Sequence, residues 1–84
     1  MYYHIIDARY IQEYIIWMKF KDGTEGEINF FHDLDGPIFE PLRIKDYFKQ
    51  FDLQGHTLHW KNGADFAPEY LYQLVKERCM AVVP

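Results

Sequence analysis

The feature that most constrains the fold is the stretch WKNGADFAPEYLY, residues 60–72. Trp60 ends an apolar run, Gly63 permits a tight bend of the backbone, and Pro68 suits the first position of a helix because a missing N–H is tolerated there. Glu69 then complements the positive end of the helix dipole. We therefore predict a strand, a turn and a helix that begins at Pro68. The buried edge of this helix is predicted to contain Leu71, Leu74, Val75 and Arg78.

Strands are predicted in the first third of the chain. Residues 5–11 and 14–20 are rich in β-branched and aromatic side chains and show no helical period. A third strand follows, in which Gly26, Ile28 and Phe30 alternate with polar residues.

The loop between the second and third strands is constrained by this alternation. A two-residue loop would set an apolar face against a charged one, whereas a three-residue loop over residues 21–23, with Gly23 left-handed, brings the apolar faces together. The predicted pairs are Met18 with Gly26, Ile16 with Ile28 and Lys19 with Glu25.

The middle of the chain favours short helical turns and a second hairpin. Pro41 limits residues 38–42 to one turn. Residues 44–48 are predicted to form another turn, with Ile44, Tyr47 and Phe48 pointing inward. In the second hairpin, a two-residue turn of Gln54 and Gly55 would place Phe51 opposite Leu58. It would keep Leu53, Leu58 and Trp60 on one face, and Thr57 and His59 on the other.

Composition agrees with one small folded domain. The chain has 84 residues, of which 49% are hydrophobic and 19% aromatic, too apolar for a disordered segment. We predict a single α+β domain over residues 1–84, with two antiparallel β-hairpins, short helical turns between them and one C-terminal helix. Its radius of gyration should be roughly 12 Å.

Charge and cysteine content restrict the partners and the compartment. The net charge of −4 is scattered, so direct binding to nucleic acid is not expected. Cys79 is the only cysteine, and the chain shows neither a signal peptide nor a membrane span. A cytoplasmic protein without membrane contact is predicted.

Two motifs resemble a known family. The pieces GPIFEPL (residues 36–42) and WKNGADFAPEYLY, in this order, are similar to the bacterial family catalogued as domain of unknown function 2442. The chain departs from it mildly at Lys61, where proline is frequent, and at Phe66, where a smaller aliphatic residue is usual. The resemblance implies no established activity. It implies an antitoxin-like role in a two-gene pair, with one small protein as partner.

No catalytic or metal-binding constellation is visible, so we expect neither an enzyme nor a cofactor. The histidines are His4, His32, His56 and His59; the last two would point to opposite faces of a strand. The cluster of Asp33, Asp35 and Glu40 beside His32 is interpreted as a solvated turn. Cys79 has no histidine nearby and is interpreted as inert.

The turn containing Asn62, Gly63 and Asp65 has two interpretations. It can grip a ligand or partner, or it can be turn chemistry in which the Asn62 and Asp65 side chains accept hydrogen bonds from nearby amides. Turn chemistry is favoured.

Aromatic and apolar residues that a small core cannot easily absorb suggest a partner-binding surface. The candidates are Phe39, Leu42, Tyr70 and Tyr72, which Tyr2 and Tyr3 would extend. For Phe39 and Leu42 the competing interpretation is that both cap one end of the sheet. We therefore expect a protein-interaction module; the alternative is a homodimeric or otherwise homo-oligomeric, or small-ligand-binding, regulatory domain.

Overall fold

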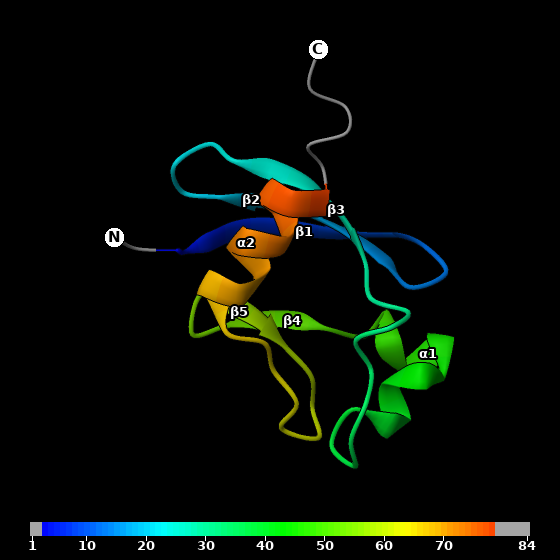
Figure 1. Ribbon diagram of the computed structural model, residues 1–84. Coiled ribbons are helices and arrows are strands. Elements are labelled where there is room, and N and C mark those ends of the chain that lie inside the picture. The colour runs from blue at the N-terminus through cyan, green and yellow to red at the C-terminus, as the bar shows by residue number, and fades with distance from the viewer. Residues whose placement is uncertain (1–2, 79–84) are drawn as a thin grey trace.

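Three antiparallel strands form the larger sheet of the computed structural model, which describes residues 3–78. They are β1 (Ile5–Gln12), β2 (Ile15–Phe20) and β3 (Glu25–Asn29), in the spatial order β1-β2-β3. A separate hairpin contains β4 (Asp52–Gln54) and β5 (Thr57–His59). The 3₁₀-helix η1 (Glu40–Arg43) and the short helix α1 (Lys45–Phe48) precede it, and α2 (Pro68–Arg78) lies across one face of the larger sheet (Figure 1).

The predicted register of the β2–β3 hairpin is confirmed. Gly23 adopts a φ of +93°, and Phe20 and Thr24 close a three-residue loop through the bond from the Phe20 N–H to the Thr24 carbonyl (2.7 Å). The observed pairs include Met18 with Gly26, Ile16 with Ile28 and Lys19 with Glu25.

The sheet that contains this hairpin has three strands, whereas the prediction described the fold as two hairpins. β1 also pairs with β2, because Gln12 lies opposite Ile15 across a two-residue turn in which Glu13 has a φ of +50°. The Tyr10 hydroxyl donates to the Glu13 carbonyl (2.9 Å) and supports this turn. The first hairpin is thus part of a three-stranded meander.

The second hairpin has the predicted loop length at a different position. Its turn residues are Gly55 and His56, with φ of +62° and +65°, so Leu53 lies opposite Leu58 and the predicted pair of Phe51 with Leu58 is wrong. The two positive φ values are typical of a type I′ turn, whose twist suits a hairpin. The sequence prediction placed His56 in the strand after the turn, whereas the structure places it in the turn itself.

The predicted inward orientation of Ile44 is also wrong. Ile44 precedes α1 and exposes 64% of its surface, whereas Phe48 is fully buried and Tyr47 is partly buried. A four-residue helix makes barely one turn, so it can direct one side chain into the core but has no second turn with which to bury Ile44.

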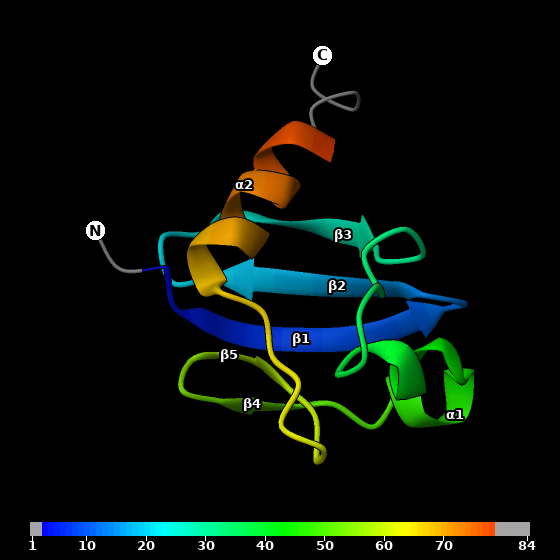
Figure 2. The same cartoon turned by 60° about the horizontal axis from the view of Figure 1, so that its bottom comes forward.

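The core lies between the sheet, the β4–β5 hairpin and α2. Leu71, Leu74 and Val75 of α2 are buried as predicted, whereas the Arg78 side chain lies outside the described residues. The indole N–H of Trp60 donates to the Phe48 carbonyl (2.8 Å), so this buried polar group is satisfied. Figure 2 shows the hairpin beside β1, with η1 and α1 at the end of the sheet.

Overall dimensions agree with the prediction. The radius of gyration over the Cα atoms is 12.2 Å. Within residues 3–78, no helix combines the length and the apolar character that a membrane crossing requires.

Candidate partner-binding site

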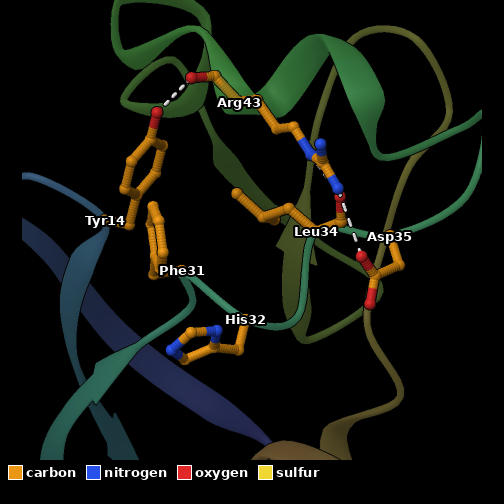
Figure 3. A pocket seen from close by; sticks show the side chains of 6 residues that line it. All are labelled: Tyr14, Phe31, His32, Leu34, Asp35 and Arg43. Carbon is orange, nitrogen blue, oxygen red and sulfur yellow. Dashed lines mark hydrogen bonds and ion pairs between the residues drawn. The ribbon is translucent and has the colours of Figure 1, made fainter.

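A hollow of about 480 Å³ opens where the chain leaves β3 and passes into η1; we call it the Phe31 hollow. Its lining residues are Tyr14, Phe31, His32, Leu34, Asp35 and Arg43 (Figure 3). They come from the β1–β2 turn, from the crossing that follows β3, and from η1. Residues distant in sequence therefore meet at one corner of the molecule.

Arg43 holds this corner together. Its Nε donates to the Leu34 carbonyl (2.9 Å) and its Nη2 to Oδ1 of Asp35 (3.2 Å). The Tyr14 hydroxyl donates to the Arg43 carbonyl, which ties the β1–β2 turn to η1 (Figure 3). The Arg43 guanidinium and the Asp35 carboxylate pair with each other, so the hollow combines this ion pair with the aromatic and aliphatic side chains of the other lining residues.

Phe31 exposes 60% of its surface, yet its ring is supported by its neighbours. The ring centroids of Tyr14 and His32 lie 5.7 and 4.9 Å from that of Phe31. A further hollow of about 450 Å³ uses the same ring; its lining residues are Glu13, Tyr14, Asn29, Phe31 and Lys45. Phe31 thus stands between two hollows.

The ion pair of Glu13 and Lys45 borders the second hollow. Lys45 Nζ lies 2.6 Å from Glu13 Oε1. The hydrogen bond to Glu13 raises the pKa of Lys45 above its ordinary value. Both side chains are about half exposed, so this pair is worth little for stability but fixes charge of both signs at the rim.

The sequence prediction missed Phe31, although a signal for it exists. Phe30 continues the inward face of β3 and is fully buried. Since successive side chains along an extended strand alternate, Phe31 had to point outward unless the chain turned sharply. Two adjacent phenylalanines at a strand end can therefore indicate one exposed ring.

Two of the residues predicted to bind a partner have roles in packing. Leu42 has no exposed surface, so it belongs to the core and is removed from the expected partner surface. Phe39 is partly buried and stacks on Phe66, with centroids 5.0 Å apart and planes at 22°. Phe66 stacks in turn on Tyr70, at 6.3 Å and 17°. Phe39 and Tyr70 thus belong to one column of three rings.

Tyr70 and Tyr72 line a different hollow of about 500 Å³, which we call the tyrosine hollow. The other residues that line it are Tyr3, Glu69, Gln73 and Lys76. The Tyr72 hydroxyl donates to Asp22 Oδ2 (2.7 Å), and that of Tyr70 to Asp33 Oδ1 (3.0 Å). These bonds attach α2 to two loops, a structural role that the sequence did not indicate. Tyr2 and Cys79 lie outside the described residues.

The Asn62 side chain is occupied at both ends. Its Oδ1 accepts from the Ala64 N–H (3.0 Å), and its Nδ2 donates to the Ile38 carbonyl (2.9 Å). Gly63 has a φ of +93°. Asp65 forms an isolated backbone bridge with His59 and has an exposed side chain. This geometry favours turn chemistry at Asn62 and Gly63 and gives no indication of a ligand.

The histidines do not gather around a common point, but two of them touch. The rings of His4 and His56 stack with centroids 3.9 Å apart and planes at 6°. Burial lowers the pKa of His4, and the nearby charges of His56 and Lys21 lower it further. His59 lies beside Asp52, 3.4 Å away. Within residues 3–78, no three histidine, cysteine or carboxylate side chains are placed to hold a metal ion.

Comparison with known proteins places the chain by family. Neither the curated proteins nor the solved structures contain a significant match. The family model described as "Protein of unknown function (DUF2442)" matches residues 5–77, which run from the first residue of β1 almost to the end of α2. The match includes Phe31, the Asn62 turn and both tyrosines of α2. Because it extends over nearly the whole chain, the protein belongs to the DUF2442 family of proteins of unknown function.

Proposed function

We propose that this protein is an interaction module that binds one protein partner, with Phe31 at the centre of the contact. The observation that carries the proposal is the exposure of Phe31, 60%, on a ring that Tyr14 and His32 already support. An aromatic side chain that is exposed and ordered loses little conformational entropy when a partner covers it.

The surroundings of Phe31 match the anatomy of a protein interface. The hollows of about 480 and 450 Å³ on its two sides can each admit a partner side chain. Arg43 with Asp35 and Lys45 with Glu13 supply a polar rim around the ring. A central aromatic anchor with a polar rim is the usual arrangement of energetically dominant interface residues.

The lining of the Phe31 hollow supports binding better than nucleophilic catalysis. The Phe31 hollow contains no serine, cysteine or lysine that could act as a nucleophile. We propose a small cytoplasmic protein as the partner, in an antitoxin-like pairing of two gene products. The family resemblance supports this finer proposal only by analogy.

The test compares two matched variants. Phe31→Ala removes the proposed anchor. Ile6→Ala, the matched control, removes a side chain of similar exposure, 54%, near the start of β1. Both should fold, because both residues are exposed. A partner captured from the host and then purified should bind the Ile6→Ala protein normally and the Phe31→Ala protein about 30-fold more weakly, which corresponds to ~2 kcal/mol. Equal affinity of the two variants would remove Phe31 from the interface.

The alternative to a different protein partner is a second copy of the same chain. Ile44 and Phe31 are the most exposed large apolar side chains in the described part of the chain, and a homodimer could bury them. Light scattering coupled to size exclusion tests this alternative. A dimeric native protein that becomes monomeric on Phe31→Ala substitution would favour self-association over a different protein partner.

A further inference from the structure

The tyrosine hollow lies away from Phe31, and the proposed contact leaves it unused. Its wall is the outer surface of the first turns of α2 together with Tyr3, which precedes β1. The Tyr3 and Tyr72 rings are 4.8 Å apart. The hollow therefore joins the two ends of the described chain on one surface.

Hydrogen bonds and ring contacts fix the aromatic walls of the hollow. Tyr72 donates to Asp22 (2.7 Å), accepts from the Thr24 hydroxyl (3.3 Å), and packs edge-on against Phe20 at 5.0 Å. Tyr70 exposes 41% of its surface while its hydroxyl donates to Asp33. Both rings are held in position before any ligand arrives, which lowers the entropic cost of binding.

The hollow is lined by one charged group of each sign, Glu69 and Lys76. The Glu69 carboxylate lines it and has no hydrogen-bond or ion-pair partner among residues 3–78. The hydrogen bonds from Tyr72 and Thr24 lower the pKa of Asp22, the carboxylate that accepts from the Tyr72 hydroxyl and fixes its ring. The Lys76 ammonium lies over the Tyr72 ring, 5.4 Å from its centroid, so an aromatic face of this hollow already holds a cation.

We propose that the tyrosine hollow receives an arginine side chain from the protein partner. A guanidinium can stack on the exposed face of Tyr70 and donate two parallel hydrogen bonds to Glu69, which a lysine ammonium cannot do. The net charge of −4 adds a general attraction for basic segments. The inference rests on the proposed function only in that the partner is a protein.

A blocked peptide with two arginines, acetyl-Gly-Arg-Gly-Arg-Gly-amide, is the probe, and the same peptide with citrulline in place of arginine is the matched control. Citrulline keeps the shape and removes the charge. In ¹⁵N NMR titrations of the full chain, the arginine peptide should cause saturable shifts in α2 and Tyr3. The citrulline peptide should bind about tenfold more weakly, and about 0.5 M salt should weaken the arginine peptide.

Two variants locate the site. Glu69→Gln should weaken the arginine peptide about fivefold, whereas Glu25→Gln, which removes an exposed carboxylate on β3, should leave its affinity unchanged. Equal affinities for the two peptides, or equal effects of the two variants, would overturn the proposal, because attraction would then come from overall charge.

Phe31→Ala separates this inference from the proposed function. The Phe31→Ala protein should bind the arginine peptide as the native protein does, since Phe31 does not line the tyrosine hollow. Normal peptide binding combined with unchanged partner affinity in Phe31→Ala would support the arginine site and contradict the Phe31 interface. Loss of peptide binding in Phe31→Ala would overturn the assignment to the tyrosine hollow.

Discussion

Asn62 shows how one side chain can join two segments that are distant in sequence. It fixes its own turn through Ala64 and reaches the carbonyl of Ile38, which is 24 positions earlier. The Asp65 side chain is exposed and has no such contact among the described residues. The two residues look equivalent in the sequence, but only one of them connects the turn to the rest of the fold.

We expect Asn62→Ala to lower the free energy of unfolding by about 1–3 kcal/mol, because two side-chain hydrogen bonds are lost, one within the turn and one to Ile38. Asp65→Ala, the matched control, should change it by less than about 0.5 kcal/mol. Urea denaturation of both variants measures the difference. If the Asn62→Ala protein has the same urea midpoint as the native protein, the structural interpretation of this side chain is wrong.

At the scale of elements, the outer edge of β1 is protected by two local devices. The Ile5 N–H donates to the His56 carbonyl of the β4–β5 turn (3.0 Å). The Ala8 N–H donates to the carboxylate of Asp7 (2.8 Å), which also lies near Arg9. Unpaired edge groups can recruit strands of other chains, so both contacts reduce the risk of edge-to-edge aggregation.

The stability that the contact between β1 and the β4–β5 hairpin provides should depend on pH. Because the pKa of His4 is lowered below its ordinary value of 6.5 in the folded protein, the unfolded chain binds more protons as the pH falls. The contribution of His4 to stability is therefore fully present above about pH 6.5 and is lost as the pH falls toward the folded pKa.

The measurement is the urea midpoint between about pH 8 and pH 5 for the native protein and for His4→Phe. The variant keeps an aromatic ring on His56 without the titrating group, so its midpoint should fall less in this interval. Both proteins contain the contact between His59 and Asp52, so the comparison isolates the effect of the His4 ring. Identical pH profiles would show that the stack does not sense protons.

The register of a hairpin could be predicted where apolar and polar side chains alternate along both strands and a glycine marks the turn. In the β2–β3 hairpin, apolar side chains alternate over two full strands, so only one loop length matched both faces, and Gly23 marked its position. The second hairpin has three-residue strands, which give too little alternation to fix a register, and its turn uses a left-handed histidine.

The candidate site was harder to predict because its residues meet only through tertiary contacts. Tyr14 and Arg43 are 29 positions apart and touch through one hydrogen bond. The misassignment of Ile44 as buried also concealed an exposed apolar side chain, which lines a separate hollow with Pro37, Glu40 and Pro41. Helical spacing is a poor guide in a helix of one turn.

At the scale of the whole molecule, the core is continuous from the sheet to α2 and includes η1 through Leu42. Leu42 is fully buried, and Ile44, two positions later, is mostly exposed. We expect Leu42→Ala to lower the free energy of unfolding by about 2–5 kcal/mol through lost burial and a cavity. Ile44→Ala should cost less than about 0.5 kcal/mol. Thermal and urea unfolding of the pair measure this contrast, and similar losses in both would contradict the assignment of Leu42 to the core.

The contacts of the sheet with late elements have a consequence for synthesis of the chain. The meander is complete by Phe30, but the residues that cover its apolar face, Leu58, Trp60, Leu71 and Val75, are made only in the second half. While the ribosome works, that face remains open to water or to other nascent chains. Because the sheet shares its core with these later elements, we expect the domain to become native only once α2 has emerged.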